Sequence, residues 1–119
     1  MTATRAVLLV DDDPDVHVLV RSRFRRTGRT DLELLHVNSA EAAVKQVPEL
    51  MERLALVLSD VRMPGRDGHA LLQDLRDIGY TGPFVLIGSL QTDGHRADAW
   101  VEKDRVFETI GELLTRYVP

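Results

Sequence analysis

The stretch Leu56–Gly68, which reads LVLSDVRMPGRDG, decides the fold of this chain. A short apolar run ends on the carboxylate Asp60, and a turn that contains Pro64 and Gly65 follows at once. An apolar run of this length is typical of a buried strand, and proline next to glycine marks a loop. The pattern therefore predicts that Asp60 stands at the carboxyl end of a strand and faces a loop.

Strand and helix patterns alternate along the whole chain. The predicted strands span residues 6–10, 31–37, 54–59, 84–87 and 99–101. Apolar residues at helical spacing predict a helix after each strand except the fourth, which a short polar segment follows. This alternation favours an α/β fold in which helices cover both faces of a parallel sheet.

Capping residues predict where several helices begin. Asp13, with a proline directly after it, suits the start of the first helix, and Asp67 suits the start of the third. Asn38 and Glu41 have the spacing of a capping box at the start of the second helix. Pro48 lies inside that helix, so we expect a break or a kink there.

Length and composition bound the class of protein. The 119 residues predict a single domain, and the absence of cysteine excludes a disulfide framework or a thiolate metal site. The net charge of −4 argues against nucleic acid as a direct partner. Because no apolar run is long enough to span a bilayer and no signal-peptide pattern is present, we expect a cytoplasmic protein without membrane contact.

Three carboxylates are expected to meet at one edge of the sheet. Asp11 and Asp12 follow the first predicted strand and Asp60 ends the third, and ligands of such sheets bind outside the carboxyl ends of the strands. Two unit charges ~4 Å apart repel by about 4 kcal/mol at an effective dielectric of ~20, so the cluster needs a cation or a proton. An all-oxygen ligand set predicts Mg²⁺. Taken alone, the acids at residues 11–15 are better explained by a solvated helix start.

The Asp11-Asp12 pair, Asp60 and the Met-Pro-Gly-x-Asp-Gly turn together resemble the receiver domain of two-component response regulators, of the chemotaxis type. The resemblance implies a flavodoxin-like, doubly wound, five-stranded parallel sheet with strand order 2-1-3-4-5. It also implies that Asp60 accepts a phosphoryl group from a sensor histidine kinase or a phosphotransfer protein in a phosphorelay. Residues 1–119 would form one receiver domain with no output domain.

The resemblance also implies roles for individual site residues. Asp12, Asp60 and the backbone carbonyl of Arg62 would bind Mg²⁺ directly, with Asp11 supporting the metal through water. Lys103 would contact the acceptor and the phosphoryl oxygens and neutralise the charge that develops during transfer. Asp60 would be the nucleophile of an in-line attack on phosphorus.

The chain departs from the family pattern at the end of the fourth predicted strand. Receivers carry threonine or serine where this chain has Gly88, and the hydroxyl comes one residue later, on Ser89. Side chains alternate along a strand, so Ser89 replaces that hydroxyl only if Gly88 permits a bulge or bend, which we expect. Trp100 matches the aromatic residue that moves inward on activation in receivers, although a half-buried packing residue is an equal interpretation.

Two further departures follow. The segment between Ser89 and Lys103 is short by roughly two helical turns, so the fourth helix of the family is expected to be shortened or missing. Asp104 stands where receivers usually have proline, often after a cis bond. Since a cis bond here costs ~2.5–4 kcal/mol, we expect a trans bond, with Asp104 capping the last helix.

Three functions compete on these residues. The leading hypothesis is a receiver that signals by phosphorylation-controlled protein–protein interaction; it is a phosphoacceptor with slow self-dephosphorylation rather than an enzyme. The alternative is a pseudo-receiver that binds a partner constitutively without phosphorylation, which Gly88 and the short fourth segment favour. A third is a phosphatase of the haloacid-dehalogenase type, but that family needs threonine or valine where this chain has Asp15.

Overall fold

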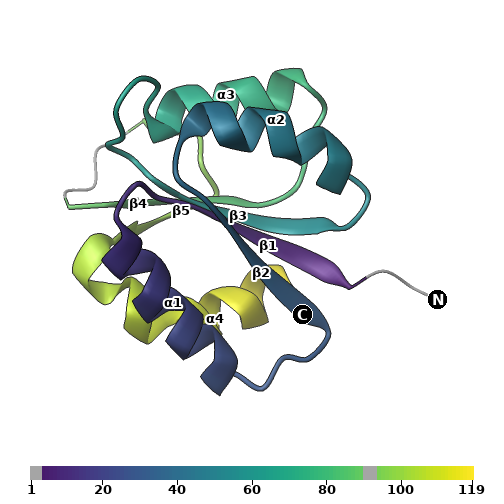
Figure 1. Cartoon of the computed structure of the whole chain (residues 1–119), viewed down its shortest axis with the longest axis vertical. Helices are drawn as coiled ribbons and strands as arrows, with labels where there is room; N and C mark the ends of the chain where they lie inside the picture. Colours follow the sequence, from purple (N-terminus) through teal and green to yellow (C-terminus); the bar gives the residue numbers. More distant parts are fainter. Residues whose placement is uncertain (1–3, 90–93) are drawn as a thin grey trace.

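Five parallel strands form a single sheet in the order β2-β1-β3-β4-β5 (Figure 1). The computed structural model describes residues 4–89 and 94–119. The strands are β1 (Arg5–Val10), β2 (Leu32–Val37), β3 (Leu54–Asp60), β4 (Phe84–Gly88) and β5 (Ala99–Glu102). The α/β class and the flavodoxin-like strand order expected from the sequence are confirmed.

Helices cover both faces of this sheet. They are α1 (Pro14–Arg26), α2 (Ala40–Leu50), α3 (Gly68–Asp77) and α4 (Val106–Tyr117), and a 3₁₀ turn, η1 (Lys103–Arg105), leads into α4. Figure 1 shows α2 and α3 on one face and α1 and α4 on the other. None of the helices in the described part of the chain is both long and apolar enough to span a membrane.

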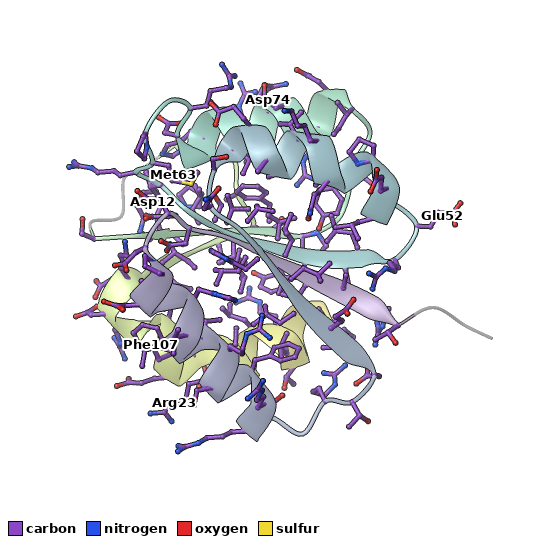
Figure 2. The ribbon with its side chains drawn as sticks, in the orientation of Figure 1. Asp12, Arg23, Glu52, Met63, Asp74 and Phe107 are labelled. Atoms are coloured by element: carbon purple, nitrogen blue, oxygen red, sulfur yellow. The ribbon has the colours of Figure 1, made fainter. Side chains whose placement is uncertain are left out.

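The side chains of β1 alternate between two buried apolar layers, which Figure 2 shows filled on both sides of the sheet. Ala6, Leu8 and Val10 pack with the buried residues of α2 and α3, whereas Val7 and Leu9 pack with those of α1 and α4. A strand covered on both faces needs apolar residues at every position, which explains the continuous apolar run.

The register of the central strands sets the position of the acidic residues. Val10, the last residue of β1, lies opposite both Val37 of β2 and Ser59 of β3. The next residues along β1 and β3 are Asp11 and Asp60, so both carboxylates lie at the same edge of the sheet. The topology therefore brings together residues that are far apart in the sequence.

The start of α2 differs from the expectation. Its N-cap is Ser39, not Asn38, because Ser39 has the extended backbone of a cap and its hydroxyl accepts a hydrogen bond from the Ala42 amide at 3.1 Å. The expected break at Pro48 is also wrong, since α2 continues to Leu50. A proline so close to the end of a helix removes one backbone hydrogen bond and leaves little helix to disrupt.

Two other predicted N-caps are confirmed and a third is wrong. The Asp13 and Asp67 carboxylates accept hydrogen bonds from backbone amides of α1 and α3, as the capping patterns predict. Asp104 does not cap α4, because η1 intervenes and places Arg105 at the N-cap position without a side-chain hydrogen bond. The bond before Asp104 is trans, since the described residues contain no cis peptide.

The connection between β4 and β5 is short, as expected. Its described residues, Ser89 and 94–98, form no helix. Residues 94–98 run as turns, bends and irregular backbone to the start of β5.

Candidate functional site

Three carboxylates converge at the carboxyl ends of β1 and β3. One oxygen from each of Asp11, Asp12 and Asp60 can be chosen so that all three lie within 4.8 Å of one another. Asp11 is fully buried and Asp60 is 4% exposed, whereas Asp12 faces solvent. The site is therefore open on one side and closed by the sheet on the other.

The Asp11 carboxylate has an unusual environment. Its Oδ1 accepts a hydrogen bond from the Asp13 amide at 2.8 Å, but its buried Oδ2 has no hydrogen-bond partner within the described ranges. Burial raises the pKa of Asp11 to about 6; the Asp13 amide opposes this shift, and the negative charges of Asp60 and Asp12 add to it. A cation at this position would relieve both the unpaired oxygen and the charge repulsion.

The donor set fits a hard divalent cation. Every converging atom is a carboxylate oxygen, and hard cations such as Mg²⁺ prefer oxygen ligands. The Arg62 amide lies 3.4 Å from Asp60 Oδ1, so the loop after β3 folds back over this carboxylate. Residue 62 is therefore near enough to Asp60 for its backbone to take part in the site.

Lys103, directly after the edge strand β5, reaches the same carboxylate. Its Nζ donates a hydrogen bond to Asp60 Oδ2 at 3.0 Å. Burial opposes the charged form, but the hydrogen bond to Asp60 and the nearby charge of Asp11 outweigh it and raise the pKa of Lys103. The ammonium group is therefore retained at neutral pH beside Asp60.

A cavity of about 470 Å³ opens above Asp60. Its lining includes most of the residues that the sequence singled out: Asp12, Asp60, Arg62, Ser89, Trp100 and Lys103. Asp11 lies below, within the buried part of the cluster. Ser89 is exposed at the rim, and none of the hydrogen bonds found within residues 4–89 and 94–119 joins its hydroxyl to Asp60 or Lys103.

The glycine that departs from the family pattern has a local explanation. A Cβ atom at Gly88 would lie 2.7 Å from Cζ2 of Trp100 and 3.0 Å from Cγ2 of Val61. Of the expected bulge or bend, no bulge is present, because β4 stays in register with β5 through Gly88, whereas the chain does bend at Ser89. Gly88 instead makes room for the indole ring, which occupies the space that a larger side chain would need.

Two histidines near the site were not singled out by the sequence. His36 Nε2 lies 2.9 Å from the Asp11 carbonyl oxygen, and its ring stacks on that of His17 at 3.9 Å between centroids. His69 of α3 lines the cavity above Asp60. The position of His36 near the end of β2 could have predicted that it lies close to Asp11. The placement of His69 depends on how α3 is rotated.

The sequence is similar to a known family and to several known proteins. A family model described as the response regulator receiver domain matches residues 7–104. The two-component response regulator ORR41 of Oryza sativa is 35% identical over 118 residues, which cover 93% of this chain and 92% of that protein. The transcriptional regulatory protein AruR of Pseudomonas aeruginosa is 33% identical over 88 residues, which cover 74% of this chain. The chain spans only 36% of the length of AruR.

Solved structures agree with this assignment. The receiver domain of the hybrid histidine kinase CckA superposes with a TM-score of 0.79 at 26% identity, covering 96% of this chain and 99% of that one. The receiver domain of the sensor histidine kinase PA1611 from Pseudomonas aeruginosa shares the fold, with a TM-score of 0.82 at 18% identity and coverage of 97% and 98%. This chain belongs to the response regulator receiver domain family.

Proposed function

We propose that the protein is a phosphoryl-accepting receiver, in which Asp60 takes a phosphoryl group from a histidine kinase or a phosphotransfer protein with the help of Mg²⁺. The observation that carries this proposal is the acidic cluster in contact with a lysine: Lys103 Nζ lies 3.0 Å from Asp60 Oδ2. A binding scaffold has no need to gather these charges, because burying them is costly. The phosphorylated form then controls binding to a downstream protein.

Each charged group has a task in the transfer. An Asp60 oxygen attacks the phosphorus of a phosphohistidine, and the P–N bond breaks as the new P–O bond forms. The leaving imidazole keeps the electron pair of that bond and takes up a proton. The Lys103 ammonium, beside the acceptor, neutralises charge on the phosphoryl oxygens.

Asp11 and Asp12, together with Asp60 and the Arg62 carbonyl, would hold the metal. Bound Mg²⁺ supplies positive charge to the phosphoryl oxygens. The unpartnered Oδ2 of Asp11 supports this assignment, and so does the PA1611 receiver, whose structure is described as having a magnesium ion coordinated in the active site cleft. Receivers are phosphoacceptors rather than true enzymes; here we propose slow self-dephosphorylation after signalling.

We also propose that residues 1–119 act as one receiver domain that signals through protein contacts, without direct contact to nucleic acid. The rice regulator, of which the chain spans 92%, supports this arrangement. The net charge of −4 agrees with it, because nucleic-acid-binding domains are usually basic.

Intact mass after incubation with acetyl phosphate tests the proposal. The wild type with Mg²⁺ should gain one phosphoryl group, and the Asp60→Asn variant should gain none. Chelation of the metal should abolish the gain in the wild type. An adduct of equal size on the variant would contradict the assignment of Asp60.

The pseudo-receiver remains the second candidate because of one contact. The indole of Trp100 packs directly on Gly88, so the hydroxyl residue that receivers use at that position is sterically excluded. If the wild type takes up phosphate or beryllofluoride and its affinity for a partner stays unchanged, binding is constitutive and the second candidate holds.

A further inference from the structure

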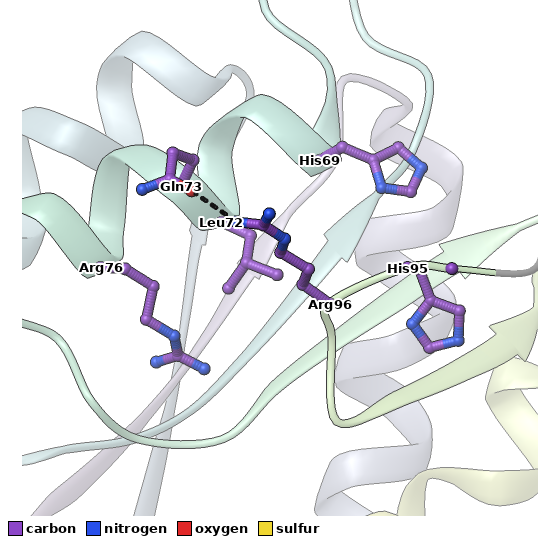
Figure 3. Close-up of a pocket in the computed structure, with 7 residues that line it drawn as sticks. His69, Leu72, Gln73, Arg76, His95 and Arg96 are labelled. Carbon is purple, nitrogen blue, oxygen red and sulfur yellow. Dashed lines mark hydrogen bonds between the residues drawn. The ribbon is translucent and has the colours of Figure 1, made fainter.

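A second cavity, of about 530 Å³, lies beside α3, on the face of the sheet that α2 and α3 cover (Figure 3). It is a groove between two segments: His69, Gln73 and Arg76 contribute from α3, and His95 and Arg96 contribute from the turn before β5. Figure 3 shows the side chains from the two segments extending around the same space. The groove occupies the side of the molecule where the fourth helix of the family is shortened or missing.

The groove is cationic although the chain is acidic overall. Two guanidinium groups line it and no carboxylate is part of its described lining, although Asp98 lies 3.7 Å from Arg76, while the net charge of the chain is −4. Such a local excess of one charge attracts a partner of the opposite charge.

The two arginines are held differently. Arg76 is fixed, because its Nη1 donates hydrogen bonds of 2.8 Å to the carbonyls of Tyr80 and Gly82, and its Nη2 lies 3.7 Å from Asp98. Arg96 is exposed, and the one hydrogen bond found for its side chain in the described structure is a long one, 3.4 Å, to the neutral amide oxygen of Gln73 (Figure 3). Arg96 is therefore able to turn toward an anionic ligand at little cost.

Unsatisfied polar atoms lie next to these arginines. The Nδ1 of His95 is buried and has no partner within the described ranges, and the same holds for Nε1 of Trp100. The Trp100 ring lies between the rings of His69 and His95, with centroid distances of 5.8 and 5.6 Å. His95 lines the groove and Trp100 lines the cavity above Asp60, so the packed rings connect the two cavities.

We propose that the groove binds an acidic segment of a partner protein, whose carboxylates pair with Arg96 and Arg76. Carboxylates suit planar guanidinium groups, which bind them with two parallel hydrogen bonds. A nucleic acid fits less well, because its binding rests on several phosphate contacts with cationic side chains, and Arg96 is the one exposed guanidinium in the described lining of the groove. The inference deepens the proposed function by giving the surface and the chemistry of the downstream partner.

The test uses the unphosphorylated protein, so its failure is separate from a failure of Asp60 to accept phosphate. An oligoglutamate peptide with blocked ends is titrated at low salt into ¹⁵N-labelled protein, and an oligoglutamine peptide is the control. Trp100 is the single tryptophan, and its ring lies 5.6 Å from that of His95, so its indole signal reports on the edge of the groove. Oligoglutamate should shift this signal and the amides of α3 and residues 94–96, and oligoglutamine should not.

Matched charge variants locate the site. Arg96→Gln should weaken oligoglutamate binding about two- to fivefold, as expected for the loss of one exposed ion pair, and Arg96→Glu should weaken it further. Arg23→Glu is the control with the same change in net charge; Arg23 is exposed on α1, in the opposite helix layer (Figure 2). Both arginines are on the surface, and unchanged spectra outside the groove would show that the variants fold.

Three outcomes would overturn the proposal. They are the absence of any shift at low salt, an equal loss of affinity in Arg23→Glu and Arg96→Glu, and tighter binding of a single-stranded oligonucleotide than of oligoglutamate in the same groove.

Discussion

Replacing Gly88 by alanine should destabilise the protein, because the added methyl carbon has no room. It would lie 2.7 Å from Cζ2 and 3.2 Å from Cε2 of Trp100, and 3.0 Å from Cγ2 of Val61. Overpacking of this kind costs about 1–3 kcal/mol, and the lower chain entropy of alanine in a strand returns roughly 0.5–1 kcal/mol. We therefore expect a net loss of about 1–2 kcal/mol in the free energy of unfolding, or roughly 4 °C in Tm for each kcal/mol.

The same change should cost little once the indole is gone. In a Trp100→Ala background the methyl group at position 88 meets only Val61, which can move by the small amount needed. The cycle of wild type, two single variants and the double variant should therefore give an interaction energy of about 1–2 kcal/mol. Urea unfolding followed by far-UV circular dichroism is the assay, since two of the proteins lack the single tryptophan.

Two results would refute this reasoning. An equal cost of Gly88→Ala in both backgrounds, within about 0.5 kcal/mol, would mean that the indole does not occupy the space above Gly88. A Gly88→Ala variant as stable as the wild type would mean that the ring moves aside freely, and Gly88 would then no longer explain the missing hydroxyl residue.

Three further predictions concern the site and the fold. Lys103→Gln should slow phosphorylation of Asp60 by about 10²-fold, because the positive charge beside Asp60 is lost. The rate of adduct formation, followed by intact mass, measures this effect. An unchanged rate would contradict the role of Lys103. Asp11 has a folded pKa of about 6 against its ordinary 3.8, so between these pH values the native state binds more protons than the unfolded state. The stability of the metal-free protein should therefore fall as pH rises through that window. At pH above this window Asp11→Asn should therefore stabilise the metal-free protein by about 1–3 kcal/mol in urea unfolding, and Mg²⁺ should remove the advantage. Ser39→Ala should cost about 1 kcal/mol in the same assay, because the Ala42 amide loses its cap, while Asn38→Ala should cost little.

The positions of the acidic residues could be predicted because they depend on strand ends. The apolar runs before Asp11 and Asp60 mark where β1 and β3 stop, and the alternation of strands and helices makes those ends adjacent. Such features need only the chain direction and the burial of each strand. The lysine could be placed by the same reasoning, since it follows β5 at the same edge.

The features that were missed depend on single dihedral angles or on side-chain packing. Asn38 and Ser39 are both good capping residues, and only the backbone conformation decides between them. The contact of Trp100 with Gly88 joins residues of different strands, and nothing local in either segment indicates it. The cationic groove likewise depends on how α3 is rotated toward the turn that holds Arg96.

The most direct measurement of the central claim is the position of the phosphoryl group. Borohydride reduces an acyl phosphate to the alcohol, so a phosphorylated aspartate becomes homoserine, which peptide mass spectrometry locates. After incubation with acetyl phosphate and Mg²⁺, we expect homoserine at position 60 alone, and none in a sample with chelator. Homoserine at Asp11 or Asp12, or none anywhere in protein whose intact mass shows the adduct, would contradict it.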